Sequence, residues 1–350
     1  MKKSLIALAV LAASGAAMAQ SSVTLFGVVD ATYAYGSGSV ANKSQLTNSG
    51  YNSSRLGFRG VEDLGGGLSA SFWLEAGVNN DNGTGGSNNT TNQTTGAIAN
   101  GGGLTFNRRS TVSLNGGFGE VRLGRDYTPQ FWNLSVFDPF GTNGVGTTQT
   151  YNSSLGGPTT VRASNAIGYF LPGNLGGFYG QAQYYMGENL STAANKKDGN
   201  GLALRAGFAN GPINVALAFS ETKFIAGNIK AVNLGGSYDL GVAKIMAHYN
   251  QDKISGGNDG KGFLIGGLVP MGAGEIRLAY STYKGSLTNP DARSDKIALG
   301  YVHNLSKRTA LYATYAHLNN KKGAAQALNG SVTGVNENSN GYDFGIKHSF

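Results

Sequence analysis

Apolar and polar residues alternate one by one over many short stretches of the chain. Near the N-terminus, Val23, Leu25 and Val29 alternate with Thr24 and Asp30. A period of two is typical of a β-strand with one apolar and one polar face. Further strands of this kind are predicted around residues 55–59, 68–78, 111–114, 120–123, 178–184, 202–208, 213–219, 232–238, 276–280 and 297–301, whereas 242–250 and 309–318 alternate too weakly for their faces to be assigned.

The connections between these strands fall into two classes that alternate along the chain. Seven are short and turn-like, and eight are longer and polar, among them 79–103, 127–161 and 250–261. Fifteen connections imply sixteen strands, with both termini on the side of the short turns. An even strand number with long loops on one rim is characteristic of outer-membrane barrels. The sequence therefore predicts an all-β fold, a sixteen-stranded antiparallel transmembrane β-barrel with long extracellular loops and short periplasmic turns.

Two soluble β architectures also contain alternating strands. A β-solenoid would have a fixed repeat period, and the sequence has none. A β-sandwich has no reason to place every long loop at one end, so the asymmetry of the connections favours the barrel. After the N-terminal segment there is no apolar run of about eighteen residues, which argues against transmembrane helices but not against strands that face lipid on one side.

The N-terminal segment has the form of a secretory signal peptide. Two lysines precede an apolar run, 5–13, and an A-x-A cleavage site ends at Ala19. The apolar run is too short for a membrane anchor. We therefore expect a signal peptide at 1–19 and a barrel domain at 20–350. The chain contains no cysteine, so this exported protein is expected to fold without disulfides.

The connector 127–161 differs from the others in composition. It contains a cluster of Phe and Trp residues between 131 and 140, and its only charged residue is Asp138. These aromatic side chains need apolar cover, so the segment is expected to pack against the protein and not to extend into water. A connector of this length is more often functional than accidental. We expect it to fold into the bore of the barrel as a constriction loop.

The final strand has a regular alternation that runs to the last residue. Tyr342, Phe344, Ile346, His348 and Phe350 fall on one face of this strand. At the exposed edge of a soluble protein such a strand would promote aggregation, whereas in a barrel it pairs with the first strand. We therefore expect this strand to close the barrel.

Several motifs resemble the general porins of Gram-negative bacteria, particularly the trimeric family found in Burkholderia, Bordetella and Neisseria relatives. These motifs are SSVTLFGVVDATY, SRLGFRGVEDLGGGLSASFWLE, FNRRSTVSLNGGFGEVRLGRDYTP, DPFG, SNAIGYFLP and the final strand that ends in Phe. The resemblance implies a homotrimer of sixteen-stranded barrels in the lipid and lipopolysaccharide of the outer membrane, with the third loop folded inward. It also implies that the barrel-insertion machinery recognises the terminal strand, with Tyr342, Phe344 and Phe350 as its signal.

In this family, basic side chains on the barrel wall face acidic groups on the inward loop. The NRR motif leaves two assignments open, because alternation from Val112 places Arg109 inside and Arg108 outside, whereas the family motif matches at Arg108. A bulge between them would reconcile the two assignments. Gly168 stands at an inward position where the resemblance leads us to expect a basic residue. The predicted pore constriction comprises Arg55, Arg59, Arg108, Arg109, Arg122, Arg125, Arg162 and Asp138, although Asp138 could instead only cap a turn.

Other functional classes find little support in the sequence. The four histidines are scattered over late strands and suggest no catalytic set. The segment GGNDGKG fails the pattern of a phosphate-binding loop, and the basic residues form no compact patch for nucleic acid. We expect no catalytic residues, no metal site, no cofactor and no nucleic-acid partner.

The expected function is passive diffusion of small hydrophilic solutes and ions through a water-filled pore. Basic residues outnumber acidic ones at the predicted constriction, and without Lys2 and Lys3 of the predicted signal peptide the formal net charge falls from +8 to +6. Both features predict a mild preference for anions. A substrate-selective channel of the same fold and a non-conducting adhesin or receptor barrel remain as alternatives.

Overall fold

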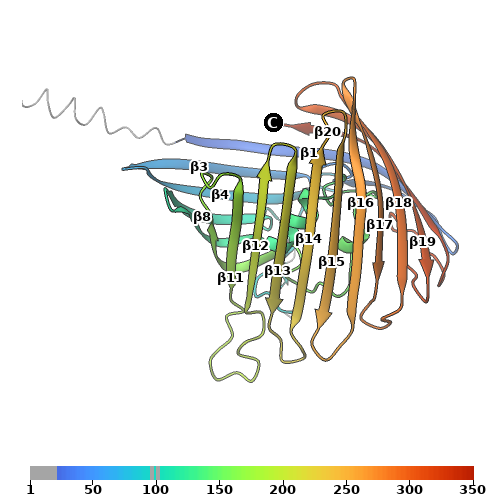
Figure 1. Cartoon of the computed structure of the whole chain (residues 1–350). Coiled ribbons are helices and arrows are strands. Elements are labelled where there is room, and N and C mark those ends of the chain that lie inside the picture. The colour runs from blue at the N-terminus through green and yellow to red at the C-terminus, as the bar shows by residue number, and fades with distance from the viewer. Residues whose placement is uncertain (1–21, 95–97, 100–102) are drawn as a thin grey trace, which may run out of the picture.

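The computed structural model describes residues 22–94, 98–99 and 103–350, and the predicted signal peptide lies outside the described residues. Sixteen long strands form one closed ring in which every strand is antiparallel to its neighbours (Figure 1). The ring closes because the first strand pairs with both the second and the last barrel strand. The predicted sixteen-stranded antiparallel barrel is confirmed.

The barrel strands are long, and short turns of a few residues join many of the consecutive strands. They are β1 (Ser22–Gly38), β3 (Arg55–Gly65), β4 (Leu68–Asn79), β8 (Arg109–Gly116), β9 (Gly119–Tyr127), β10 (Arg162–Phe170), β11 (Phe178–Tyr185), β12 (Gly201–Asn210), β13 (Ile213–Thr222), β14 (Ile229–Asp239), β15 (Lys244–Ile254), β16 (Asp259–Met271), β17 (Gly274–Lys284), β18 (Arg293–Asn304), β19 (Thr309–Lys321) and β20 (Ser339–Ser349).

Short elements lie in the connections between these strands. They are β2 (Lys43–Asn48), β5 (Thr84–Gly85), β6 (Asn88–Asn89), β7 (Ile98–Ala99), α2 (Pro129–Val136) and the 3-10 helix η1 (Gln149–Asn152). Among the described residues, no helix combines the length and the apolar character needed to cross a bilayer.

The connector predicted at 250–261 is much shorter than expected. In the structure β15 continues to Ile254 and β16 begins at Asp259, so that Gln251 pairs with Lys261 across the ladder. Polar residues continue through these strand ends because Asn250 and Asp252 point into the barrel, where Asp252 accepts a hydrogen bond from a tyrosine. The length of this loop was therefore predicted wrongly from its polarity.

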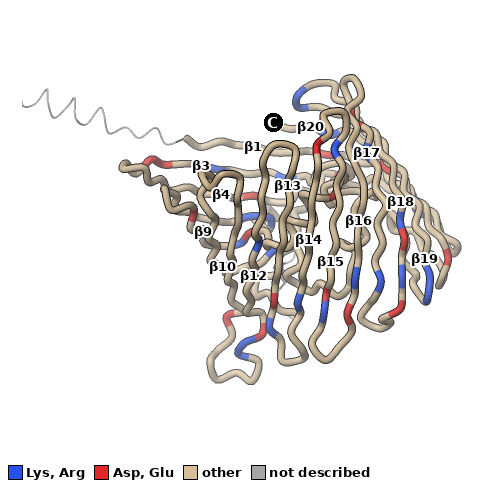
Figure 2. The backbone as a smooth tube through the Cα atoms, viewed as in Figure 1, with Lys and Arg blue, Asp and Glu red and all other residues tan. Residues whose placement is uncertain are grey.

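The outer wall of the barrel is apolar at the outward positions of the strands. Leu217, Leu234 and Leu278, for example, are exposed on three different strands. Figure 2 shows that much of the outer wall carries neither acidic nor basic residues, and that Lys and Arg gather inside the barrel behind β12 and near the lower strand ends. A belt of apolar side chains on the outside matches a wall that faces lipid.

The two segments whose faces could not be assigned lie in β15 and β19. Met246 and His248 point inward on β15, and Ala316 and Leu318 point inward on β19. Their alternation is weak because these inward positions are themselves apolar or buried. Ala316 and Leu318 pack in one apolar cluster with Phe140 and Val145 of the segment that fills this side of the barrel.

That segment is the long connection between β9 and β10, which lies inside the ring of strands (Figure 1). Its apolar side chains pack against glycines that face the interior of the barrel on every second strand. A Cβ atom added to any of these glycines would come within 3.0 Å of the loop. The pairs, loop residue first, are Phe137 with Gly235 on β14, Pro139 with Gly266 on β16, Phe140 with Gly300 on β18, and Val145 with Gly341 on β20.

Polar contacts fix the same loop to the wall. Lys296 is 1% exposed and its Nζ donates a hydrogen bond to the carbonyl oxygen of Val145 over 3.0 Å. The backbone N–H of Val145 donates to Asp343 Oδ2 at 2.7 Å. The Asn133 side-chain amide donates to the carbonyl oxygen of Ala216 at 2.9 Å. The loop thus has a defined position in the bore, as its composition predicted.

The connection between β4 and β8 contacts a different part of the same barrel. Asn92 is buried, and its side-chain amide donates to the carbonyl oxygens of Ser164 and Met186 at 2.8 and 3.0 Å. Asn92 Oδ1 accepts from the backbone N–H of Ser164 at 2.7 Å. Ser164 and Asn165 interrupt the register between β9 and β10. This connection therefore covers an irregular point in the wall next to the start of β10.

The last strand closes the barrel through both backbone and side-chain contacts. Phe350 exchanges two backbone hydrogen bonds of 3.1 Å with Gly27, and a Cβ at Gly27 would lie 2.3 Å from the Phe350 ring. Tyr342 packs against the rings of Tyr35 and Tyr315. Phe344 is exposed on the outer face, as is Phe350.

Candidate functional site

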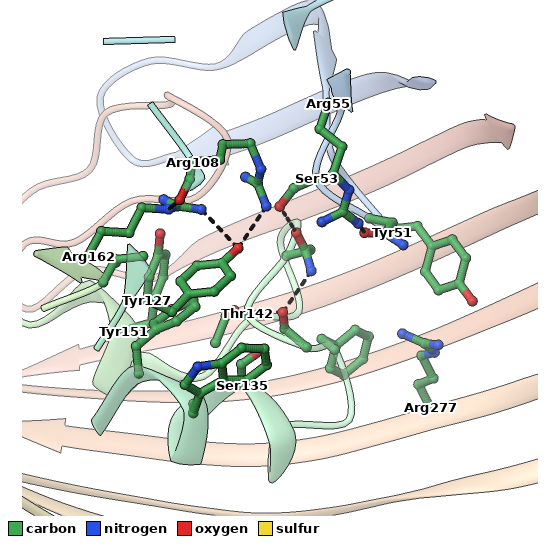
Figure 3. A pocket seen from close by; sticks show the side chains of 17 residues that line it. Tyr51, Ser53, Arg55, Arg108, Tyr127, Ser135, Thr142, Tyr151, Arg162 and Arg277 are labelled. Carbon is green, nitrogen blue, oxygen red and sulfur yellow. Dashed lines mark hydrogen bonds between the residues drawn. The ribbon is translucent and has the colours of Figure 1, made fainter. Parts of the chain in front are cut away.

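A space remains in the bore between the inward loop and the barrel wall. A cavity of about 410 Å³ is present there (Figure 3). Arginines come from the wall and from the segments that join the loop to it, whereas aromatic and hydroxyl side chains come mainly from the loop. The cavity is lined by Tyr51, Asn52, Ser53, Arg55, Arg108, Tyr127, Phe131, Trp132, Ser135, Phe140, Gly141, Thr142, Asn143, Tyr151, Val161, Arg162 and Arg277.

Arg108 and Arg162 meet at the hydroxyl of Tyr127 (Figure 3). Arg108 Nη2 donates to this oxygen at 2.7 Å, and Arg162 Nη2 donates to it at 2.9 Å. Arg162 Nε also donates to the carbonyl oxygen of Arg108 at 2.8 Å, and its guanidinium lies 4.3 Å from the centroid of the Tyr127 ring. These contacts hold two positive groups at one side of the cavity.

Both arginines of the NRR motif lie in the interior. Arg108 donates to Glu75 Oε1 at 2.6 Å, and Arg109 donates to Thr111 Oγ1 at 3.0 Å. Alternation assigns Arg109 correctly because β8 begins at that residue. It assigns Arg108 to the outside wrongly, because Arg108 precedes the strand and strand alternation does not apply to it. The pairing of β4 with β8 runs from Glu75 and Arg109 without a register shift, so no bulge is involved.

A second cavity of about 390 Å³ is lined by three more of the predicted constriction arginines. Arg59, Arg109 and Arg122 line it together with Trp73 and Glu120. The guanidinium groups of Arg59 and Arg109 lie 5.1 and 4.6 Å from the Trp73 ring centroid. The predicted arginines therefore form two groups, one at the loop and one further along the wall.

Arg125 lines neither cavity. Its Nε donates to the carbonyl oxygen of Asn107 at 2.6 Å, and its Nη1 donates to Ser164 Oγ at 2.8 Å and to the carbonyl oxygen of Asn89 at 3.1 Å. These partners belong to the connection between β4 and β8 and to the irregular point of β10. Arg125 joins the two segments and adds no charge to the lining of either cavity.

Asp138 also lines neither cavity, although it lies in the inward loop. It is 3% exposed and accepts hydrogen bonds from the backbone N–H groups of Phe140, Thr142 and Thr148 at 2.9, 3.2 and 3.0 Å. Burial raises the pKa of the Asp138 carboxyl, while these N–H donors lower it in part. The geometry is that of a turn cap, the alternative that the sequence left open.

Acidic partners of the arginines stand on the wall. Glu75 lies 2.6 Å from Arg108 and 3.7 Å from Arg55. Arg122 forms ion pairs with both Glu120 and Asp126. Within the described part of the chain, four arginines line the first cavity, and the carboxylates in ion-pair contact with them are Glu75 and Glu275. Positive charge is therefore in excess there.

Arg277 belongs to the first cavity, but the sequence analysis did not select it. Its guanidinium lies 4.5 Å from the Tyr51 ring centroid, on the opposite side of the cavity from Arg162 (Figure 3). Alternation contained the signal, since Ile276 and Leu278 point outward and the residue between them must point inward. Tyr127, which binds two arginines, carries no such signal because its role depends on where the loop leaves the wall.

Among the described residues, no group of three His, Cys, Asp or Glu side chains could hold a metal ion. His248 is buried with both ring nitrogens unpaired, and it lies behind the loop, opposite Gly235 in the ladder. Polar groups in the first cavity are instead guanidinium, hydroxyl and amide groups. Such a lining presents hydrogen-bond donors and positive charge to an anion in passage.

Comparison with known proteins assigns the chain to a family. Residues 5–323 match the family described as Gram-negative porin. The chain belongs to the Gram-negative porin family. It is 41% identical to outer membrane porin protein 32 of Delftia acidovorans over the full length of both chains. It is 29% identical to an outer membrane porin protein of Bordetella pertussis, with 91% of this chain and 95% of that protein covered.

A solved porin structure agrees with the fold of this porin. It is the anion-selective porin from Comamonas acidovorans, with 36% identity, a TM-score of 0.83, and coverage of 95% of this chain and 100% of that one. The resemblance drawn from the sequence motifs is thereby confirmed. The protein is a β-barrel porin of the Gram-negative outer membrane.

Proposed function

We propose that this porin is a general diffusion channel with a mild preference for anions. The observation that carries the proposal is the excess of guanidinium groups over carboxylates around the cavity between loop and wall. Positive groups in a narrow bore raise the local concentration of anions and lower that of cations. The description of the Comamonas acidovorans relative as anion-selective supports the same direction.

The two groups of inward arginines have separate roles in this proposal. Arg55, Arg108 and Arg162, with Arg277, set the field at the narrowest point, and Arg59, Arg109 and Arg122 extend it along the wall. Glu75, Glu120 and Asp126 limit the strength of the selectivity because they pair with several of these arginines. Arg125 and Asp138 act by holding the segments that frame the pore.

The assembly of the protein follows from the same family membership. We infer a homotrimer in outer-membrane lipid and lipopolysaccharide, since closed cyclic assembly would remove part of the apolar outer wall from lipid. Phe344 and Phe350 are exposed on the outer face of the terminal strand, and together with Tyr342 they would form the signal for the barrel-insertion machinery. The signal peptide at 1–19 would direct export. The channel would act without catalysis or a cofactor.

Conductance of the purified protein in a planar lipid bilayer tests the channel proposal. An open, ohmic conductance and passage of small neutral sugars into proteoliposomes are expected. Block of the current by one solute at low concentration would favour the substrate-selective alternative. Absence of conductance from trimers and monomers alike would overturn the proposal and favour an adhesin or receptor barrel.

A further inference from the structure

The first cavity has two chemically different sides. Guanidinium groups of Arg55, Arg108 and Arg162 line one side, and rings carried by the loop line the other (Figure 3). Its volume of about 410 Å³ falls within the range of small-molecule sites. An inorganic anion such as chloride would use only the basic side of this cavity.

The rings on the loop side form a supported surface. Tyr127 stacks on Phe131 with a centroid distance of 4.8 Å, and Trp132 meets Tyr127 edge-on at 5.2 Å. Phe131 is buried beneath them, whereas Trp132 and Tyr127 are partly exposed. The Trp132 Nε1 atom is itself buried and has no hydrogen-bond partner among the described residues. Trp132 therefore offers ring carbons to the cavity and not its N–H group.

The basic and aromatic sides meet at Tyr127. Its hydroxyl binds Arg108 and Arg162, and the face of its ring lies against the Arg162 guanidinium. These contacts fix the guanidinium groups within reach of a solute that rests on the rings. A carboxylate can accept paired hydrogen bonds from guanidinium, and a planar ring attached to it can pack against Trp132.

We propose that this cavity is a weak binding site for small monocarboxylates that carry an aromatic ring. The proposal rests on the proposed function, because the solute must first enter the pore as an anion. Its carboxylate lies against Arg108 and Arg162, and its ring packs on Trp132. Contact between aromatic rings typically strengthens an interaction roughly three- to tenfold beyond the burial of apolar area, so benzoate binds more tightly than acetate by at least this factor.

Single-channel current in potassium chloride, with benzoate or acetate added, tests the site. Benzoate is expected to reduce the chloride current at a concentration at least about threefold lower than acetate. Benzyl alcohol, which has the ring without the charge, is expected to leave the current unchanged at those concentrations. The substitution Trp132→Leu keeps apolar bulk on the helix but removes the aromatic contact, and is expected to narrow the difference between benzoate and acetate roughly three- to tenfold. Val136→Ala, in the same helix but outside the lining of this cavity, is expected to preserve the difference.

The outcomes separate this site from the proposed function. If the unmodified protein prefers chloride but benzoate and acetate block it equally, the proposed binding site is wrong. The proposal of an anion-preferring channel would still hold. An unchanged benzoate block in Trp132→Leu would also overturn it. If the unmodified protein shows no preference for chloride over potassium, the proposed function is overturned instead. Cyclohexanecarboxylate that blocks as well as benzoate would contradict the requirement for an aromatic ring.

Discussion

At the residue scale, the position of each arginine depends on what precedes and follows it in the chain. Alternation identified Arg55, Arg59 and Arg122 as inward residues, since each lies inside a regular strand. It failed at Arg108, which precedes its strand. Arg125 was included because it lies close to the start of the loop, but its direction depends on contacts with a distant connection. Contacts between loops are not encoded in a local period.

Arg162 is the most direct test of charge at the constriction. Its hydrogen bonds go to a carbonyl and a hydroxyl oxygen, so Arg162→Gln removes a positive charge without depriving a carboxylate of its partner. Two unit charges 4 Å apart in water interact by about 1 kcal/mol, which corresponds to about a fivefold change in an equilibrium. We expect the anion-to-cation permeability ratio to fall by about this factor. Reversal potentials in a potassium chloride gradient measure it.

The matched control for Arg162→Gln is Lys196→Gln, which removes the same charge from an exposed loop. Charges in solvent are screened within about 8 Å at physiological salt, so this variant is expected to keep the original ratio. Equal effects of the two substitutions would show that the ratio follows net charge and not the charge at the cavity.

Asp138 should matter for the shape of the loop more than for selectivity. In Asp138→Asn, one of the two oxygens that accept backbone N–H groups becomes an N–H₂ group, which cannot accept. We expect noisier single-channel current and a smaller shift in reversal potential than in Arg162→Gln. Asp291→Asn at the exposed rim is the control for loss of a carboxylate. A larger potential shift in Asp138→Asn than in Arg162→Gln would contradict the assigned role.

At the scale of elements, the sequence predicted the ring of strands better than the lengths of their connections. Strand number and closure followed from the alternation of long and short connections. The polar ends of β15 and β16 were mistaken for a loop, because inward residues of a wet barrel are polar along the whole strand. That the loop would enter the bore followed from its aromatic residues, whereas the glycines that receive them could be recognised only in three dimensions.

The contact between Phe137 of the loop and Gly235 of β14 offers a test of how the wall positions the loop. A Cβ at Gly235 would lie 2.1 Å from the Phe137 ring, so Gly235→Val must push the loop away from the wall and into the bore. Such overpacking costs about 1–3 kcal/mol. We expect lower single-channel conductance from an otherwise folded barrel. Gly236→Val is the control, because the nearest atom to a Cβ there is 3.5 Å away. Equal conductance in both variants would contradict the claim that the contact between Phe137 and Gly235 positions the loop.

The connection between β4 and β8 should stabilise the wall from which the loop departs. Asn92→Asp replaces two donated hydrogen bonds with a carboxylate that faces the carbonyl oxygens of Ser164 and Met186. Loss of a buried donor typically costs about 1–3 kcal/mol. We expect a lower unfolding temperature of the purified barrel than for Asn82→Asp, a substitution at an exposed position of the same connection. Identical unfolding temperatures would argue against this role for Asn92.

At the scale of the whole molecule, closure depends on the end of the chain. The Phe350 ring covers Gly27 on the first strand, and the two residues exchange a pair of backbone hydrogen bonds. We expect Phe350→Asp to lower the amount of folded, heat-resistant barrel several-fold, with Ser349→Asp much closer to the unmodified protein. Electrophoretic mobility of unheated samples measures the folded fraction. Equal folded yields would remove Phe350 from the closure mechanism.

Selectivity is also a property of the whole barrel, because wall, loop and connections together set the charge that a permeating ion meets. The predicted preference for anions arises from guanidinium groups that the wall and the loop bring to one cavity, with fewer carboxylates paired to them. The zero-current potential of the unmodified protein, measured across a planar bilayer in a steep potassium chloride gradient, tests this most directly. The account predicts a potential with the sign of the chloride equilibrium potential. A potential with the sign of the potassium equilibrium potential would contradict it and would assign the dominant field to Glu75, Glu120 and Asp126.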